Sequence, residues 1–333
     1  MTSSSSEPKS RLGEFALIKK LFAPLSKGAR GAFDLSDDAA ALHLAEDREL
    51  VVTVDTVIEG VHFLKDDPAD LIARKALRVN LSDLAAKGAA PHGYLLALSV
   101  SPWVGDAWLE RFAAGLSDDQ GRFDVHLLGG DTTAGPGPLT ISITALGSVP
   151  RHRMIRRAGA VPGDVVYVSG TIGDAGAGLE ILRGAGASLS DAQKTQLIAR
   201  YRLPEPRVSL GAKLQGFASA SIDVSDGLIA DLAHIAEVSG VAIEIDAARI
   251  PLSAAYRALG RREIDGIVRA ATSGDDYEIA FTAPLSAHAA VEAAAEEVGL
   301  AIARIGDVKA GQGVVLLHNG EPVPVERAGY THF

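Results

Sequence analysis

The stretch VVTVDTVIEGVHF, residues 51–63, is the part of the sequence around which the rest is organised. Three valines within its first four positions predict a buried strand. The strand ends in Asp55 and Thr56, Gly60 turns the chain, and His62 follows in the loop. A carboxylate, a hydroxyl and an imidazole at a strand end favour ligand chemistry in an α/β sheet. The alternative is a strand with an ordinary polar turn, because Asp and Thr are common at strand ends.

Length and composition bound the architecture. The 333 residues, 47% of them hydrophobic, predict two domains with sizeable cores. Prolines, glycines and arginines gather over residues 150–163, so we place the domain boundary there. We therefore predict a disordered, Ser-rich N-terminus over 1–11, an N-terminal domain over 12–150 and a C-terminal domain over 151–333, both mixing helices and strands in an α/β (α+β) fold.

Residue types and segments that are absent from the sequence exclude several classes of function. There is no cysteine, which excludes disulfides, thiolate metal sites and cysteine nucleophiles. No apolar run is long enough to span a membrane, and residues 1–11 lack the apolar core of a secretory signal, so we expect a cytoplasmic protein that binds no membrane. The net charge of −10, from 42 acidic residues against 32 Lys and Arg, argues against nucleic-acid binding. An anionic ligand would need divalent cations to bind to so acidic a chain.

The apolar periodicity predicts helices and strands along the whole chain. Helices are expected over 13–25, 68–89 and 102–118, and strands over 39–44, 93–100, 125–133, 139–149, 165–170 and from 220 onward. Further helices should follow Gly173 and Gly227, and an apolar strand should follow Glu278. Within the helix over 68–89, Asn80, Asp83 and Lys87 share a polar strip, so Asp83 is either a site residue or part of a solvated face.

Acidic residues recur with one pattern, in which a strand and a tight turn lead to Asp beside a hydroxyl or a glycine. The clusters are Asp37–Asp38, Asp55, Asp131, Asp223–Asp226 and Asp275–Asp276, and Asp83 adds one acid from a helix. Carboxylate and hydroxyl oxygens, without Cys or paired His, suit Mg²⁺ better than Zn²⁺. For Asp226 taken alone, the alternative is a helix N-cap.

Nucleotide binding would have to use these acids, because the sequence has no Walker, protein-kinase or dinucleotide-binding motif. Gly129 and Gly130 precede Asp131 and would let a ligand approach the backbone closely. Gly173 begins a helix, where backbone N–H groups could bind an anion. The arginines over 151–157 are either a solvated linker, which we favour, or a cationic face for a phosphate. The residues alone indicate a metal-dependent enzyme that acts on phosphorylated small molecules.

Nine segments together resemble the thiamine-monophosphate kinases of the aminoimidazole-ribonucleotide-synthetase-like superfamily. They are GEF at 13–15, DLSDDAA at 34–40, VTVDTVIEGVHF at 52–63, NLSDLAAKGA at 80–89, GGDTT at 129–133, RRAGAVPGD at 156–164, SIDVSDGL at 221–228, GDDYE at 274–278 and GYTHF at 329–333. The segments span nearly the whole chain in family order. The DxSDG and GGD motifs alone would indicate only the superfamily.

The resemblance implies transfer of the γ-phosphoryl group of ATP to thiamine monophosphate, the last step of thiamine diphosphate biosynthesis. It implies an N-terminal domain whose strands help to form a barrel in a homodimer. Because one phosphate attacks another, the barrier is largely electrostatic, and several Mg²⁺ ions would neutralise both substrates. We therefore expect direct in-line transfer without a protein nucleophile, centred on Asp55, Asp131 and Asp223.

The resemblance also assigns residues by their place in the motifs. The Mg²⁺ positions are Asp38, Thr53, Asp55, Asp83, Asp131, Asp223 and Asp226. The ATP contacts are Gly130, Asp131, Arg157 and Ser225, and the thiamine monophosphate contacts are His62, Asp275 and Tyr330. Two residues depart from the family pattern: Asp275 stands where many relatives carry Glu, and Arg327 stands where a Trp often precedes the tail. The groups that stack on the thiamine ring therefore stay open.

Two alternative functions remain at this point. The first is another enzyme of the superfamily, such as an aminoimidazole-ribonucleotide synthetase, a selenophosphate synthetase or the hydrogenase-maturation dehydratase. The last two usually depend on a reactive Cys or selenocysteine, which this chain lacks. The second alternative is a non-catalytic thiamine- or nucleotide-binding relative, which the retained set of acids disfavours.

Overall fold

The computed structural model describes residues 13–261 and 263–331 of the chain. The segment predicted to be disordered, 1–11, lies outside these residues. The chain divides into two compact units, Met1–Asn80 with Pro91–Ser148 and Leu81–Ala90 with Val149–Phe333. The short stretch Leu81–Ala90, which includes the end of a long helix, therefore belongs with the second unit rather than the first.

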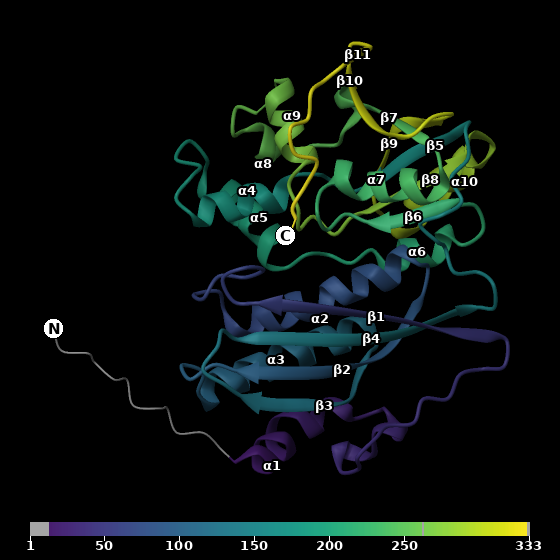
Figure 1. Cartoon of the computed structure of the whole chain (residues 1–333). Helices are drawn as coiled ribbons and strands as arrows, with labels where there is room; N and C mark the ends of the chain where they lie inside the picture. Colours follow the sequence, from purple (N-terminus) through teal and green to yellow (C-terminus); the bar gives the residue numbers. More distant parts are fainter. Residues whose placement is uncertain (1–12, 262, 332–333) are drawn as a thin grey trace. The chain divides into compact units, whose positions relative to one another are not determined.

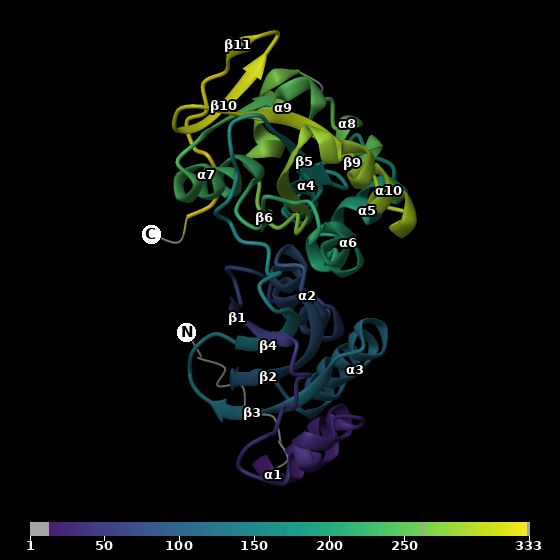
Figure 2. The same cartoon turned by 90° about the vertical axis from the view of Figure 1, so that its right-hand side faces the viewer.

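The first unit is a four-stranded sheet with two long helices on one face (Figures 1 and 2). The strands are β1 (Arg48–Ile58), β2 (Ala90–Val100), β3 (His126–Ala134) and β4 (Thr140–Pro150), in the order β1-β4-β2-β3. The helices are α2 (Ala69–Ala86) and α3 (Asp106–Phe123). Strands β2 and β3 run parallel, with a register shift at Tyr94 and Leu95.

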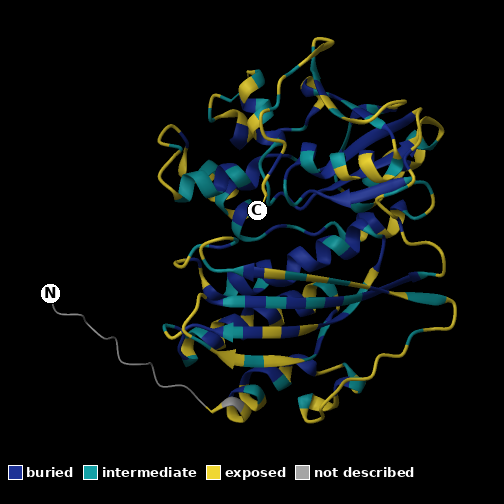
Figure 3. Ribbon diagram, viewed as in Figure 1, coloured by how far each residue is buried: buried dark blue, intermediate teal, exposed yellow. Residues whose placement is uncertain are grey.

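Strand β1 confirms the strand predicted from residue 51 onward but corrects its end and its burial, because it continues to Ile58 and holds Asp55 and Thr56 within it. Its side chains alternate, so Val51 and Val57 are buried while Val52 and Val54 are 54% and 60% exposed. A strand with helices on one face buries only every second residue, and a run of valines cannot show whether the second face is covered. Figure 3 shows this alternation along the sheet as bands of buried and exposed residues.

The region before β1 is less regular than predicted. The expected helix over 13–25 is divided into α1 (Glu14–Leu17), a π-helical turn (Ile18–Phe22) and a 3₁₀ turn (Ala23–Ser26), and a further 3₁₀ segment covers Arg30–Leu35. The strand predicted over 39–44 is wrong. The N–H of Ala41 donates instead to the carbonyl of Gly31 at 2.8 Å, which closes a loop rather than a sheet ladder. Alanines at 39–41 also carry little intrinsic preference for a strand.

The second unit is a seven-stranded sheet in the order β11-β10-β7-β9-β5-β8-β6. Its strands are β5 (Asp164–Ser169), β6 (Ala220–Asp223), β7 (Ala242–Asp246), β8 (Ile279–Pro284), β9 (Ile302–Lys309), β10 (Gly313–His318) and β11 (Glu321–Pro322). Its helices are α4 (Asp174–Leu182), α5 (Asp191–Arg202), α6 (Val208–Leu214), α7 (Leu228–Ser239), α8 (Ala254–Arg257), α9 (Ile264–Ala271) and α10 (His288–Val298), with 3₁₀ turns at Ala247–Arg249 and Leu285–Ala287.

Helices cover both faces of this second sheet. The fully buried strand β5 shows the arrangement: Val166 and Val168 pack into one core with α7, while Val165 and Tyr167 pack into another with α6 and α10. Two cores on opposite faces explain why β5 reads as an unbroken apolar run. None of the helices in the described residues is long and apolar enough to cross a membrane.

Candidate functional site

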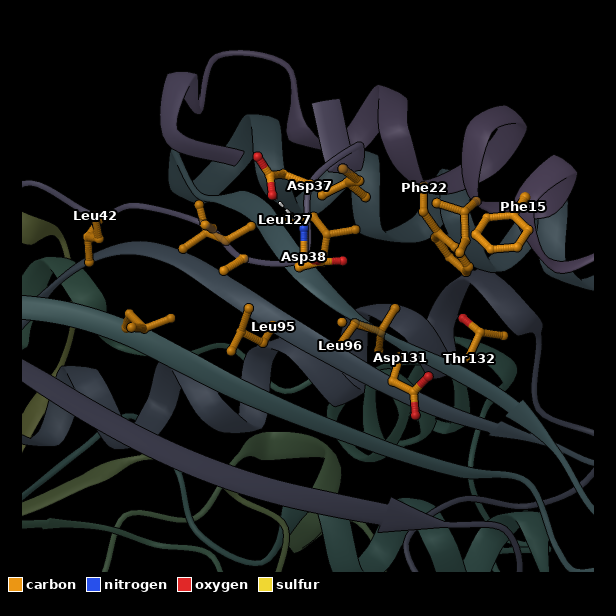
Figure 4. A pocket seen from close by; sticks show the side chains of 18 residues that line it. Phe15, Phe22, Asp37, Asp38, Leu42, Leu95, Leu96, Leu127, Asp131 and Thr132 are labelled. Carbon is orange, nitrogen blue, oxygen red and sulfur yellow. Dashed lines mark hydrogen bonds between the residues drawn. The ribbon is translucent and has the colours of Figure 1, made fainter. Parts of the chain in front are cut away.

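The first unit holds a cavity of about 720 Å³ between its N-terminal helical turns and the sheet (Figure 4). Asp37 and Asp38 line it from the segment before β1, and Asp131 lines it from β3. The backbone N–H of Asp38 donates to the Asp37 carboxylate at 2.8 Å. Phe15, Phe22 and several leucines supply apolar walls. The structure thus brings together two predicted acids, Asp38 and Asp131, beside a surface that can accept a flat apolar group.

Gly130, a predicted ATP contact, is required by strand packing. A Cβ at this position would lie 1.9 Å from the carbonyl oxygen of Leu96 on β2, whereas a Cβ at Gly129 would lie 3.4 Å from the flexible end of Leu95. From the sequence we predicted that both glycines let a ligand approach the backbone. Moreover, Gly130 and Asp131 lie inside β3 rather than in a turn after it, which corrects the expected pattern of strand, turn and acid.

Thr53 and Asp55 project from the helix-covered side of β1, because they alternate with the exposed Val52 and Val54. The backbone N–H of Asp55 donates to Oδ1 of Asn80 at 3.0 Å, and Nδ2 of Asn80 donates to the Ala76 carbonyl at 3.0 Å. Asn80 is fully buried. It therefore fixes Asp55 to helix α2, and neither Thr53 nor Asp55 lines the cavity.

The turn after β1 fixes the tautomer of His62. The N–H of Ile58 donates to Nδ1 of His62 at 3.1 Å, so Nδ1 acts as an acceptor. A neutral ring then carries its proton on Nε2, which is the tautomer that can donate to a phosphate oxygen. The ammonium of the buried Lys75 donates to the His62 carbonyl at 2.9 Å and secures the backbone of the same turn.

In the second unit, backbone hydrogen bonds join three motifs that lie far apart in the sequence. The N–H of Asp275 donates to the Ser225 carbonyl at 2.8 Å, the N–H of Tyr277 donates to the Val224 carbonyl at 2.7 Å, and the N–H of Tyr330 donates to the Asp226 carbonyl at 2.9 Å. The predicted ATP contact Ser225 and the predicted substrate contacts Asp275 and Tyr330 therefore meet in one place.

Asp223, at the end of β6, is the most strongly perturbed acid of this group. Burial raises the pKa of Asp223 well above its ordinary range, and the negative charge of Asp83 raises it further. Lys87 lies beside the pair, donates from Nζ to the Ser221 carbonyl at 2.6 Å, and has its pKa lowered to about 8 by burial. Asp83 is therefore more than a solvated helix residue. A buried carboxylate beside a half-buried one favours a cation nearby.

Asp226 does not cap helix α7, so the N-cap alternative for it is wrong. The N-cap is Gly227, and Oδ2 of Asp231 accepts the backbone N–H groups of Asp226 and Gly227, each at 3.1 Å. Burial raises the pKa of Asp231 to about 7, and the charge of Asp226 adds to the rise. The Asp231 carboxylate thus holds the two residues that precede the helix, and the Asp226 carboxylate takes no part in capping.

Asp276 and Glu278 of the GDDYE motif are structural, which separates them from their neighbour Asp275. The Asp276 carboxylate accepts the N–H of Gly173 at 2.6 Å at the start of α4, so the anion site expected there is filled from within the protein. Glu278 pairs with Arg200 and Arg207 and is fully buried. Asp275 adopts a left-handed backbone conformation, with φ of 70°, and stays partly exposed.

The remaining predicted residues lie on exposed segments. Arg157 is exposed with its arginine neighbours, and its charge contributes to lowering the pKa of Lys87, which places it near the acid pair. Arg327, which departs from the family pattern, donates to the Gly329 carbonyl at 2.9 Å and to Thr331 at 3.3 Å. It therefore braces the tail that carries Tyr330. His332 and Phe333 of the GYTHF segment lie outside the described residues.

The predicted metal ligands divide between the two units. Asp38, Thr53, Asp55 and Asp131 belong to the first, and Asp83, Asp223 and Asp226 belong to the second. Across 13–261 and 263–331, no three Asp, Glu, His or Cys side chains form a group that could hold a metal ion. A cation at either set of acids would therefore have to complete its shell with water or phosphate oxygens, as Mg²⁺ commonly does.

Two residues of the site were not predicted. Lys87 was seen only as part of a polar strip, and its burial beside Asp223 depends on the packing of the second unit. Asp231 gave a clearer signal, because an acid between Ile229 and Leu232 on an apolar helix face needs a buried partner. The partner is the N-terminus of its own helix.

Comparisons with known proteins identify the family of the chain. The AIR synthase related protein N-terminal domain matches residues 36–149, and the AIR synthase related protein C-terminal domain matches residues 161–319. The thiamine-monophosphate kinase of Caulobacter vibrioides is 42% identical over 327 residues, covering 96% of this chain and 90% of the relative. The crystal structure of thiamine-monophosphate kinase from Stenotrophomonas maltophilia K279a has a TM-score of 0.82 at 42% identity, covering 94% of this chain and 98% of that chain.

A further structure, AaThiL complexed with AMPPCP and TMP, has a TM-score of 0.75 at 32% identity and covers 98% of this chain and 100% of that chain. Matches of this length and identity confirm the predicted two-domain fold of helices and sheets, and they confirm the resemblance drawn from the motifs. The chain belongs to the thiamine-monophosphate kinase family, within the AIR synthase related proteins.

Proposed function

We propose that this chain transfers the γ-phosphoryl group of ATP to thiamine monophosphate, giving thiamine diphosphate and ADP. The observation that carries the proposal is the hydrogen-bonded junction of the second unit, where Ser225, Asp275 and Tyr330 meet. These are one predicted contact for the donor and two for the acceptor. The family membership supports the same activity, because a relative of similar fold has been solved with AMPPCP and TMP.

The proposed reaction requires no covalent bond between the phosphoryl group and the protein. Donor and acceptor are both anions, so the barrier is dominated by charge repulsion and by the cost of alignment. Direct in-line transfer needs no side-chain nucleophile, and the chain has no Cys to supply one. The contribution of the protein is to hold the two phosphates in line and to exclude water from them.

The acids fit Mg²⁺ as the cation. The oxygen-rich donor set favours a hard divalent ion, and so does the buried Asp223, whose pKa is raised by burial and further by the charge of the half-buried Asp83. The residues that would hold it are Asp38, Thr53, Asp55 and Asp131 in the first unit and Asp83, Asp223 and Asp226 in the second. When bound, Mg²⁺ neutralises phosphate charge and thereby lowers the repulsion between donor and acceptor.

The other polar residues have roles that follow from their geometry. ATP would contact Gly130, Asp131, Arg157 and Ser225. His62, with its proton on Nε2, donates to the phosphate of thiamine monophosphate, and its Nδ1 is engaged by Ile58. Asp275 carries negative charge and suits the cationic thiazolium ring of the acceptor, while Tyr330 is 44% exposed and offers an aromatic face.

The face of the first sheet opposite helices α2 and α3 supports a homodimer. Four large apolar side chains lie exposed on it: Leu50, Val52, Val54 and Leu95, at 45%, 54%, 60% and 39%. Exposed β-branched residues in register on a sheet face favour a second sheet as the partner. The partner that we propose is a second copy of the chain, as in the barrel implied by the resemblance. A cytoplasmic location stays a prediction.

An ADP-release assay tests the proposed activity. We expect release that depends on both thiamine monophosphate and Mg²⁺, and thiamine diphosphate formed in equal amount. ADP release with another acceptor but not with thiamine monophosphate would identify a different superfamily enzyme. Binding of thiamine monophosphate without any ADP release would identify a non-catalytic relative. Trapping of a phosphorylated side chain during turnover would overturn direct transfer.

A further inference from the structure

The turn that carries His62 is tied to a tryptophan from a distant segment. Nε1 of Trp103 donates to Oε2 of Glu59 at 3.0 Å. The same carboxylate oxygen accepts the N–H of Leu139 at 3.2 Å, and the N–H of Glu59 donates to the Leu139 carbonyl at 3.0 Å. The Glu59 side chain therefore joins the turn to two other segments of the first unit through a single oxygen.

Glu59 lies within the hydrogen-bonded turn that presents His62. The N–H of Gly60 donates to the Phe63 carbonyl at 2.8 Å, and the N–H of His62 donates to the Ile58 carbonyl at 3.0 Å. Gly60 has a φ of 83°, which is a conformation that other residues rarely adopt. A tight turn of this kind transmits a displacement of Glu59 to the imidazole three residues later.

The ring of Trp103 is itself held in place. It meets the ring of Trp108 edge to face, with centroids 5.8 Å apart and an interplanar angle of 87°. The Lys65 ammonium lies 5.8 Å from the Trp103 ring centroid. Trp108 in turn stacks on Phe112 at 5.2 Å. Packing of this kind fixes the direction of the indole N–H, so the bond to Glu59 has a rigid donor.

We infer that Trp103 is a positioning residue for the phosphate acceptor, because its hydrogen bond to Glu59 holds the turn at residues 58–63 in the conformation that presents His62. The inference rests on the proposed function, in which His62 contacts thiamine monophosphate. It assigns a specificity role to a side chain outside the acid motifs. Loss of the bond leaves the carboxylate of Glu59 with one donor fewer and lets the turn sample other conformations.

Four variants separate the hydrogen bond from packing and from charge. Trp103→Phe keeps an aromatic ring and removes the N–H donor. Glu59→Ala removes the acceptor, whereas Glu59→Gln removes the charge and replaces one oxygen by an amide NH2 but keeps a carbonyl oxygen as acceptor. Trp108→Phe is the matched control, because it makes the same substitution in the same cluster, keeps an aromatic ring against Trp103 and leaves the bond from Trp103 to Glu59 in place. Each variant is compared with the wild type for kcat and for the KM of each substrate.

For Trp103→Phe and Glu59→Ala we expect the KM for thiamine monophosphate to rise roughly five- to tenfold, the effect of one net hydrogen bond. The KM for ATP and kcat should stay within about twofold in all four variants, because the bond acts through the acceptor turn alone. Glu59→Gln and Trp108→Phe should resemble the wild type. A Trp103→Phe variant with unchanged KM for thiamine monophosphate, or with both KM values raised together, overturns the inference.

Hydrogen exchange of the ligand-free protein tests the turn independently of activity. The amides of Gly60 and His62 should exchange faster in Trp103→Phe than in the wild type and should be unchanged in Trp108→Phe. Equal exchange in the wild type and Trp103→Phe overturns the positioning role even if the enzyme is an active kinase. A wild type that shows no release of ADP with thiamine monophosphate overturns the proposed function instead, and the exchange result still decides whether Trp103 holds the turn.

Discussion

The carboxylate of Asp276 accepts the backbone N–H groups of Gly173 and Ala175, at 2.6 and 3.3 Å, and so occupies the N-terminus of helix α4. Its sequence neighbour Asp275 instead lies on the junction with Ser225, in a left-handed backbone conformation. Two adjacent acids of one motif therefore have different tasks. Asp276 stabilises the fold, and Asp275 is the acid of the motif for which we propose a contact with thiamine monophosphate.

Substitutions at these two positions should separate stability from activity. Asp276→Ala leaves two buried N–H groups without an acceptor, so we expect the free energy of unfolding to fall by about 1–3 kcal/mol. Asp275→Asn keeps a residue that tolerates positive φ, so stability should stay the same while the KM for thiamine monophosphate rises. Urea unfolding and steady-state kinetics on both variants check this. Equal stability losses in the two variants would contradict the division of roles.

The buried Asp174 should make stability depend on pH. Burial raises the pKa of Asp174, and hydrogen bonds from the hydroxyls of Ser253 and Thr171 offset this only in part. The unfolded chain has a pKa of about 3.9 for Asp, so the folded state binds this proton more tightly. Below the unfolded value both states are protonated and there is no penalty. As the pH rises through the folded value, stability is lost, and above it the loss is constant.

The comparison that isolates this effect is wild type against Asp174→Asn. The stability of the wild type relative to the variant should decrease from pH 4 upward and then level off. Urea unfolding across a pH series measures the difference in unfolding free energy between the two proteins. Hydrogen bonds altered by the substitution add a constant to this difference and do not change its dependence on pH. A relative stability that rises with pH would show that the Asp174 pKa is lowered rather than raised.

Asp223 should be essential for turnover and dispensable for folding. Asp223→Asn removes a buried ionisable group whose charged form is disfavoured by burial and by the nearby Asp83, so in magnesium-free buffer its Tm should be no lower than that of the wild type. Turnover should fall by roughly a hundredfold or more, because electrostatic stabilisation of the phosphates is lost. Asp174→Asn, another buried acid of the same unit, is the matched control. Near-normal turnover in Asp223→Asn would remove this residue from the proposed cation site.

Much of the candidate site follows from the sequence, because its motifs are local. The strand that carries Asp55, the helix that carries Asp83 and the DVSDG turn lie where periodicity placed them. What could not be predicted depends on contacts between segments distant in the chain. The capping of α4 by Asp276 joins positions 103 residues apart, and no local pattern distinguishes it from a free acid. The same holds for the indole of Trp103, which reaches Glu59 across 44 residues.

Burial was the second quantity that the sequence could not decide. Val52 and Val54 have the composition of a core strand, yet they face outward. An apolar pattern indicates that a strand face favours burial. It does not indicate whether the same chain or a second chain would bury that face. Gly130 shows the opposite case. Its sequence context suggested room for a ligand, whereas the close approach of β2 already requires a residue without a Cβ.

The two glycines before Asp131 should therefore respond differently to alanine. In Gly130→Ala the new Cβ would lie 1.9 Å from the Leu96 carbonyl, so we expect a loss of about 2–4 kcal/mol in stability as β2 and β3 separate. In Gly129→Ala the nearest atom is 3.4 Å away on a flexible side chain, and the cost should stay below about 1 kcal/mol. Urea unfolding compares them. Equal stability with a shared loss of ATP affinity would instead favour a ligand role for both.

The exposed sheet face should control the oligomeric state. Val54→Glu introduces a charge at a side chain that is 60% exposed in the single chain, so the folded monomer should tolerate it. In a dimer that buries this face, the same charge would lose its water without gaining a partner, and an interface of standard size could not offset several such contacts. We expect light scattering to give a dimer for the wild type and a monomer for Val54→Glu. Val238→Glu, 54% exposed on α7, is the control and should remain dimeric. A dimeric Val54→Glu variant would place the interface elsewhere.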